Sequence, residues 1–192
     1  MFAEVSSKLP WFIARSGGLV AWAVCTASVV WGLTLSTRLV RRKGAPAWLL
    51  DLHRFLGTLS IVFTVVHLLG LWLDTFVPFS IKDFFIPYRN RWRPGWVAWG
   101  IVAFYLLIAI QVSSWAMRKM PRKVWHTIHL TSFLLFAFAT IHAFGTGADH
   151  KNRLVIFGCF TGGSFVMFLA LFRLLAPRKA RRRPADRESV PV

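Results

Sequence analysis

Four histidines in long apolar stretches are the residues of this chain best suited to do chemistry. His67 follows His53 by 14 positions in one stretch, and His142 follows His129 by 13 positions in another. Polar side chains are costly at membrane depth, so four of them need a common explanation. Neutral imidazole is the commonest metal ligand in proteins, and it also forms hydrogen bonds between helices. The pattern therefore indicates a metal-containing site or, alternatively, helix packing through histidine.

Five apolar segments are long enough to carry these histidines across a membrane. A helix that crosses a hydrocarbon core of about 30 Å needs about 20 apolar residues. The chain has 192 residues, of which 56% are hydrophobic, and this exceeds what a soluble domain uses. We predict an all-α, polytopic membrane helix bundle. Its five predicted transmembrane helices cover residues 17–39, 48–73, 95–117, 124–144 and 154–176.

The strong positive charge of the chain is distributed as membrane topology requires. Lys and Arg number 24 against 7 Asp and Glu, which gives a net charge of +17. They lie in short clusters between the apolar segments, 16 on one side of the predicted layout and 8 on the other. The positive-inside rule then places the N-terminus outside and the C-terminus in the cytoplasm. We expect a multi-pass protein of the cell (plasma or inner) membrane that contacts lipid and binds no nucleic acid.

The segments outside and between the spans have simpler interpretations. Residues 1–16 are predicted to be an outer N-terminal segment, and residues 177–192 a basic, disordered cytoplasmic tail near anionic lipid. The longest loop, 74–94, mixes aromatic and basic side chains. We interpret it as an interfacial aromatic belt or, alternatively, as a rim over an anionic group near the outer surface.

Helical geometry arranges the histidines in two levels. The two sequence separations correspond to roughly 21 and 19.5 Å along a helix axis. Both helices are predicted to run outward, so His53 is level with His129 near the inner surface, and His67 with His142 near the outer one. The shorter separation, however, falls about 140° short of four turns, so a common face requires a bulge or kink. His126 is an alternative to His129 at the inner level.

The group that best suits two imidazoles at one depth is an iron porphyrin. Hard metal cations and transported protons would favour carboxylates inside the membrane, but all 7 acidic residues lie at or beyond its predicted edge. A haem needs an axial imidazole from each side, an apolar slot, and basic groups near water for its propionates. The residues therefore predict two b-type haems, each held by two histidines.

Several neighbours of the histidines are candidate haem contacts, and each has a structural alternative. Gly57 and Gly70 follow the histidines of the second span by four and three positions. They could leave room for a flat macrocycle, although glycine also serves close helix packing. The candidate propionate partners, which could equally be solvated charges at the interface, are Arg54 at the inner level and Arg89, Arg91 and Arg93 at the outer level.

Four short motifs resemble the ferric reductase-like transmembrane domain family. This family includes the membrane domains of NADPH oxidases and ferric reductases and the haem subunit of the bacterial periplasmic methionine-sulfoxide reductase system. The motifs are DLHRFLG, VVHLLG, WHTIHL and IHAFGTGAD, within a resemblance over roughly residues 15–176. It implies that residues 17–176 form a haem domain that relays electrons across the bilayer. The implied ligand pairs are His53 with His129 and His67 with His142.

The chain departs from the family's larger members, in which a flavin and nicotinamide domain follows the last helix. No glycine-rich phosphate loop follows Ala176 here. We therefore expect an electron-transfer subunit of an oxidoreductase, with a separate donor (a cytoplasmic flavoprotein or membrane quinol) and an outer-side acceptor. Binding of FMN at the inner face stays an open alternative. The hypothesis from another class is a non-redox transporter or scaffold whose histidines bind a metal ion or pack helices.

Overall fold

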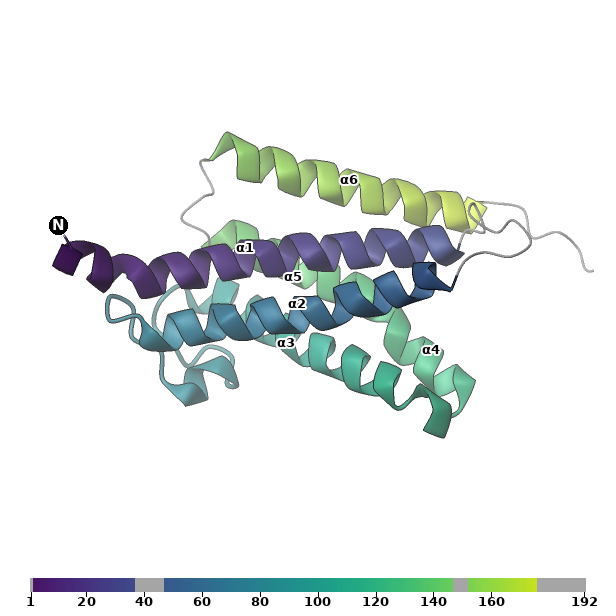
Figure 1. The fold of residues 1–192 in the computed structure, drawn as a ribbon, viewed down its shortest axis with the longest axis horizontal. Coiled ribbons are helices and arrows are strands. Elements are labelled where there is room, and N and C mark those ends of the chain that lie inside the picture. Colours follow the sequence, from purple (N-terminus) through teal and green to yellow (C-terminus); the bar gives the residue numbers. More distant parts are fainter. Residues whose placement is uncertain (1, 37–46, 147–151, 176–192) are drawn as a thin grey trace, which may run out of the picture.

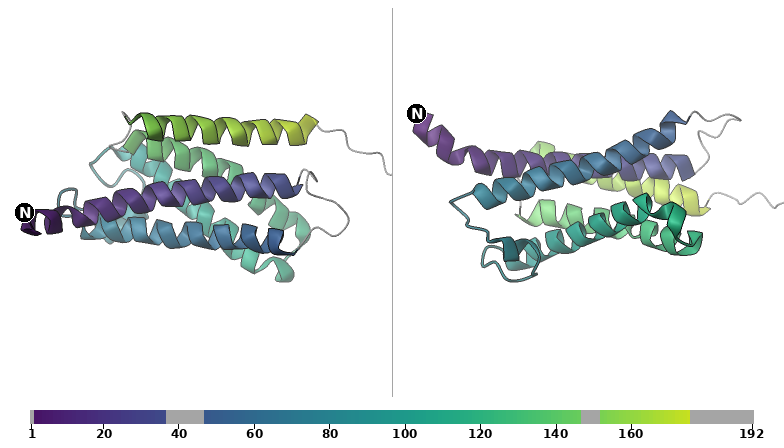
Figure 2. Two further views of the ribbon diagram at one scale, coloured as in Figure 1. Left: turned by 45° about the horizontal axis from the view of Figure 1, so that its top comes forward. Right: turned by 60° about the horizontal axis from the view of Figure 1, so that its bottom comes forward.

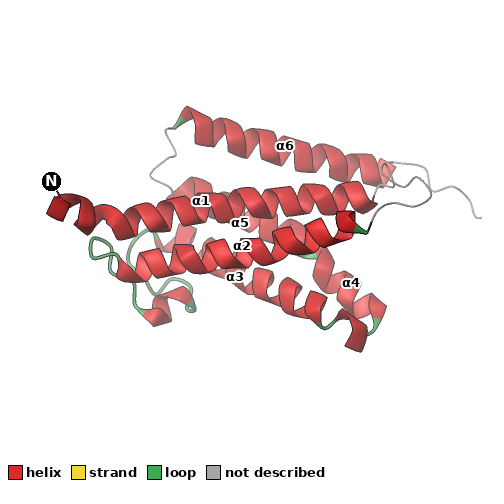
Figure 3. Ribbon diagram, viewed as in Figure 1, coloured by secondary structure: helices red, strands yellow, loops and turns green. Residues whose placement is uncertain are grey.

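The computed structural model describes residues 2–36, 47–146 and 152–175, and their long elements are all α-helices (Figures 1 and 3). The predicted cytoplasmic tail, 177–192, lies outside the described residues. The helices, including two short 3₁₀ helices labelled η, are α1 (Phe2–Ser36), α2 (Trp48–Leu73), η1 (Ile81–Phe84), α3 (Pro94–Trp115), η2 (Met117–Lys119), α4 (Arg122–Leu130), α5 (Ser132–Thr146) and α6 (Arg153–Leu175).

Five helical segments are long and apolar enough to span a membrane, which confirms the predicted all-α, multi-pass architecture. They are Lys8–Ser36, Trp48–Leu73, Pro94–Trp115, Arg122–Thr146 and Arg153–Leu175. The first helix begins at Phe2 and contains Pro10, whereas the predicted span begins at residue 17. Hydropathy marks where a helix enters the membrane and not where helical hydrogen bonding starts, so the predicted N-terminal segment is helical from residue 2.

The bundle consists of two closely packed helix pairs with α6 on one side. α1 makes its most extensive contact with α2, α3 packs chiefly on α5, and α2 and α3 touch only slightly. Two views of the ribbon show α6 beside α1 (Figure 2). α1 and α2 can approach closely because a Cβ on Gly70 would overlap the backbone of Ala14, and one on Gly17 would lie 3.0 Å from the backbone nitrogen of His67.

The fourth span is divided by a single residue, Thr131, between α4 and α5. Both the backbone N–H and the hydroxyl of Thr131 donate to the carbonyl of Ile128, at 3.0 and 2.7 Å. This bond to the third preceding residue tightens the backbone and interrupts the regular helical ladder. The division supplies the departure from regular helix that the separation of His129 and His142 requires.

The interior of the bundle is a narrow apolar core. Its central cluster joins Cys25 of α1 to Leu107 of α3 and Leu135 of α5. Many large apolar side chains lie on the outside, and Leu154 and Phe157 of α6 are 81% and 72% exposed. Such exposure on helices of this length is the surface that a hydrocarbon environment covers.

Candidate functional site

The structure brings the four predicted histidines together in two pairs. The ring centroids of His53 on α2 and His129 on α4 are 5.9 Å apart, with the ring planes at 75°. Those of His67 on α2 and His142 on α5 are 6.2 Å apart at 78°. The exposed ring of His126 contacts Trp125 at 6.4 Å. The predicted pairs are thus neighbours in space, one near each end of the bundle.

The spacing within each pair suits a shared metal. Imidazole nitrogens bind transition metals at about 2 Å, which places the centres of two rings on opposite sides of a metal roughly 6 Å apart. A bare transition-metal ion commonly takes four ligands, whereas the described residues contain no group of three or more His, Cys, Asp or Glu that could hold an ion. Two imidazoles are the donor set that an iron porphyrin uses at its axial positions, so the residues fit that group.

Three of the four imidazoles are oriented by backbone carbonyls of neighbouring helices. Nδ1 of His67 lies 2.6 Å from the carbonyl oxygen of Ala14. Nδ1 of His53 lies 3.2 Å from that of Ser28, and a third such contact of 2.9 Å joins His142 to Trp96. Because a carbonyl only accepts hydrogen bonds, each Nδ1 carries the proton and leaves the lone pair of Nε2 for a metal. Metal-binding histidines commonly have such a partner.

Three glycines that sequence reasoning missed lie against these same rings. A Cβ on Gly18 would be 2.8 Å from Nδ1 of His67, and one on Gly100 would be 2.5 Å from Nδ1 of His142. On Gly32 it would be 3.1 Å from Cε1 of His53. The available signal was the separation of Gly18 and Gly32, which equals the separation of the two histidines of α2.

His129 has a different environment from the other three histidines. Its Nδ1 is buried and has no hydrogen-bond partner. The ring stacks instead on Trp125 of the same helix, with centroids 5.1 Å apart and planes at 24°. The indole nitrogen of Trp125 is likewise buried without a partner. The His53–His129 pair is therefore supported by hydrogen bonding on one side and by stacking on the other.

A cavity opens beside the His67–His142 pair, at the end of the bundle that we name the His67 end. Its walls come from α1, α2, α3 and α5 and from the segment between α2 and α3, and they are mostly apolar. Arg15 of α1, which sequence reasoning missed, also lines this cavity and lies over the ring of Trp11 at 5.0 Å. The cavity thus combines two imidazoles, an apolar wall and a cationic side chain.

Three of the four predicted propionate partners contact other residues in the structure. Arg54 pairs with the exposed carboxylate of Asp51 at 3.2 Å, near the opposite end of the bundle, the His53 end. Arg89 pairs with Asp83 at 3.2 Å. Arg93 donates to the carbonyl of Gly145 at 2.7 Å, and Arg91 is exposed.

The two glycines predicted as haem contacts both face neighbouring helices. A Cβ on Gly57 would lie 3.1 Å from the side-chain oxygen of Gln111 on α3. Gly70 faces the backbone of Ala14 on α1. Gly70 therefore serves the close packing of α1 against α2.

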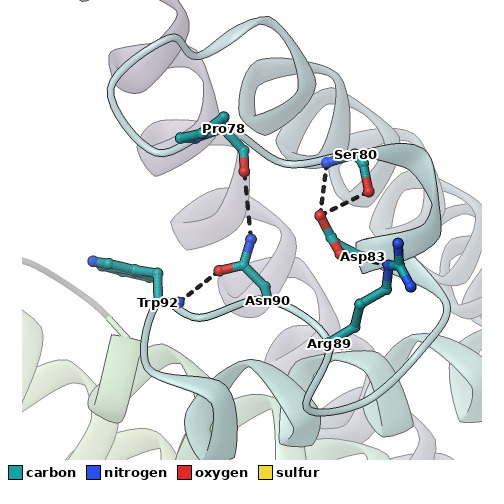
Figure 4. A network of polar contacts seen from close by, with 6 residues as sticks. All are labelled: Pro78, Ser80, Asp83, Arg89, Asn90 and Trp92. Atoms are coloured by element: carbon teal, nitrogen blue, oxygen red, sulfur yellow. Dashed lines mark hydrogen bonds and ion pairs between the residues drawn. The ribbon is translucent and has the colours of Figure 1, made fainter.

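The segment between α2 and α3 is held over the cavity by a polar network (Figure 4). One carboxylate oxygen of Asp83 accepts hydrogen bonds from the backbone N–H and the hydroxyl of Ser80, both at 2.8 Å. The other pairs with Arg89. Asn90 donates to the carbonyl of Pro78 and accepts from the N–H of Trp92. Because Asp83 and Trp92 line the cavity, this network shapes its wall.

Replacing Asp83 with asparagine is expected to loosen this segment and lower the thermal stability of the protein. Burial raises the pKa of the Asp83 carboxyl, but the hydrogen bonds from Ser80 and the nearby charge of Arg89 together lower it by more, so the net pKa lies below its usual range. The ionised Asp83 carboxylate therefore stabilises the folded protein fully above the pKa of an unfolded Asp, about 4. This stabilisation is lost as the pH falls through the lower pKa of Asp83 in the folded protein.

The measurement is the melting temperature of the detergent-solubilised protein between about pH 3 and 7, a range that brackets the ordinary carboxyl pKa, with Asp51→Asn as the control. Asp51 pairs with Arg54 on an exposed surface, where an ion pair contributes little. The difference between wild type and Asp83→Asn should shrink below about pH 4. A difference that stays constant across this range would contradict the role of the carboxylate.

Comparison with known proteins gives one finding on the family. The family model described as ferric reductase like transmembrane component matches residues 17–140, about two thirds of the chain. The match includes His53, His67 and His129 and ends just before His142. Neither the search of curated proteins nor the search of solved structures found a match.

Proposed function

Because the chain belongs to the ferric reductase-like transmembrane family, we propose that it is a membrane b-type cytochrome that relays electrons across the bilayer through two haems. His53 and His129 hold one haem, and His67 and His142 hold the other. The observation that carries this proposal is the two pairs of facing imidazoles, with centroids 5.9 and 6.2 Å apart. The proposed haem domain extends over residues 17–176.

The chain's own residues supply and orient the histidines of each site. Nε2 of His53, His67 and His142 would bind haem iron, because the carbonyls of Ser28, Ala14 and Trp96 hold the Nδ1 of these three rings. The ring of His129 would supply the fourth ligand. When bound, a haem supplies the one-electron chemistry of its iron. α2 separates its two histidines by roughly 21 Å along its axis. The two sites therefore form two steps that together cross most of the membrane.

Positive side chains near each site are suited to the propionate groups of a haem. At the His67 end we propose Arg15 for this role, because it lines the cavity that holds His67 and His142. At the His53 end Arg54 is the candidate, and its pairing with exposed Asp51 is a weak competitor. Arg91 stays a candidate at the His67 end. Arg89 instead pairs with Asp83 in the segment between α2 and α3, and Arg93 donates to the carbonyl of Gly145 on α5.

The direction of electron flow is proposed from the charge distribution of the chain. The excess of Lys and Arg on one side supports a cytoplasmic position for the His53 end and an outer position for the His67 end. Electrons would then enter beside His53 from a separate flavoprotein or membrane quinol and leave beside His67 to an outer-side acceptor. On this proposal the chain is the electron-transfer subunit of a reductase in the plasma or inner membrane.

A reduced-minus-oxidised absorbance spectrum of the purified full chain tests the proposal, together with extraction and counting of its haem. We expect about two b-type haems per chain, as two histidine pairs require. One haem per chain would leave one pair with a structural role and would overturn the two-step relay. Folded protein that remains free of haem after reconstitution would overturn the cytochrome proposal and favour a transporter or scaffold.

A further inference from the structure

The three carbonyls that orient histidines share one local arrangement. Each accepting residue is followed, four positions later in its helix, by a glycine: Gly18 after Ala14, Gly32 after Ser28, and Gly100 after Trp96. A Cβ in an α-helix tilts toward the N-terminus, so the side chain at position i+4 lies over the carbonyl of position i. A Cβ there would overlap the imidazole at Gly18 and Gly100 and would crowd it at Gly32.

The shared arrangement also explains how each carbonyl serves two donors. A carbonyl oxygen has two lone pairs, and the helix uses one of them for the N–H four positions later. The second lone pair is available to a group that approaches from the side. The observed distances are 2.6, 3.2 and 2.9 Å. Glycine at position i+4 leaves that approach open, whereas a Cβ would block it at Gly18 and Gly100 and narrow it at Gly32.

On α1 the arrangement occurs twice with the same period as the histidines of α2. Ser28 follows Ala14 by 14 positions, and Gly32 follows Gly18 by the same interval. Because α1 and α2 run in opposite directions along one another (Figure 1), Gly18 meets His67 and Gly32 meets His53. The equal spacing lets one helix support both histidines of the other in the same way.

We infer that Gly18, Gly32 and Gly100 are positioning residues, each of which holds one histidine with its proton on Nδ1 and its Nε2 lone pair available to a haem. This inference rests on the proposed function. A hydrogen bond from Nδ1–H to a carbonyl makes the imidazole a stronger donor to iron and lowers the reduction potential. The glycines therefore act on the potentials of the two haems and not only on packing.

The fourth histidine lies outside this arrangement, which makes the two sites unequal. The residue 14 positions after Gly100 on α3 is Ser114 and not a second glycine. His129 stacks on Trp125, and its Nδ1 has no acceptor. The pair His67–His142 thus has two carbonyl-oriented ligands and the pair His53–His129 has one.

Glycine-to-alanine variants of the full-length haem-loaded protein test the inference by redox titration. Gly100→Ala and Gly18→Ala are each expected to raise the midpoint potential of one and the same haem and to leave the other unchanged. Gly32→Ala is expected to raise the potential of the other haem by less, because the new Cβ would lie 3.1 Å from the ring instead of 2.5 or 2.8 Å. Gly158→Ala and Gly163→Ala are the matched controls, since nothing lies within 4 Å of a Cβ at either position.

A measurement on the wild type keeps the inference testable where a variant does not fold. In the reduced, low-spin protein with ¹⁵N-labelled histidine, three ligand Nδ1–H groups should show strong hydrogen bonding and a fourth should not. Four equivalent Nδ1–H groups would overturn the inference. So would unchanged midpoint potentials in all three variants, and in that case two haems per chain would leave the proposed function standing. A wild type without haem would instead defeat the proposed function itself.

Discussion

Replacing His67 with alanine is expected to remove one of the two proposed haems and to stop the proposed electron transfer across the protein. The haem between His67 and His142 would lose one of its two ligands, and the remaining haem would lie at the other end of α2, roughly 21 Å away along the helix. His142→Ala should give the same loss, because both rings face the same site. The measurements are the haem content per chain and the rate of transmembrane electron transfer in reconstituted vesicles.

The matched control for this prediction is His126→Ala. His126 lies on α4 only three positions before His129, but its ring is exposed, and the aromatic ring it contacts among the described residues is that of Trp125. Both haems should be retained in His126→Ala, whereas His129→Ala should lose the haem that His53 shares. Loss of haem in His126→Ala with none in His129→Ala would overturn the ligand assignment at the His53 end. Two haems in His67→Ala would overturn it at the other end.

Replacing Gly70 with alanine is expected to destabilise the bundle by about 1–3 kcal/mol, the usual cost of overpacking. The added Cβ would overlap the backbone nitrogen and Cα of Ala14, and a backbone cannot rotate away as a side chain can. α1 and α2 would have to separate, although their contact is the most extensive in the fold. The measurement is the free energy of unfolding in detergent micelles.

Gly158→Ala is the control for helix propensity. Both substitutions gain about 1 kcal/mol of intrinsic helix stability, but a Cβ at position 158 meets nothing within 4 Å. The difference between the two variants therefore isolates the contact of α1 with α2. Equal stability of Gly70→Ala and Gly158→Ala would contradict the close approach of the two helices.

The sequence was sufficient to predict the helices and the two levels of the histidines, because both follow from periodic properties. The choice of His129 over His126 as the partner of His53 came from the family resemblance. Hydropathy over about 20 residues identifies a span, and a rise of about 1.5 Å per residue sets the depth of His53 and His67 in it. The spacing of His129 and His142 also required a departure from regular helix. Its position at Thr131 was not predictable, because a threonine hydroxyl that bonds to an earlier carbonyl occurs in intact helices as well.

The residues around the histidines were less predictable, because their contacts depend on which helices pack together. Gly18 and Gly32 have the same spacing in the sequence as the two histidines of α2. This match predicts contacts between them only when α1 is known to lie against α2. Arg89 and Asp83 belong to a loop without a regular period, so their ion pair could not be inferred. Because Arg89 pairs with Asp83, it stabilises the segment between α2 and α3.

The paired histidines come from one unbroken helix and one divided span, and this affects where the length of the chain can change. α2 contributes one histidine to each pair without interruption, whereas the opposing histidines belong to two separate helices, α4 and α5. A single insertion in α2 between His53 and His67 would rotate one ring by about 100° relative to the other. Thr131 lies between α4 and α5, so a change of length there falls outside both helices. Length variation among related chains should therefore concentrate at this junction and spare the middle of α2.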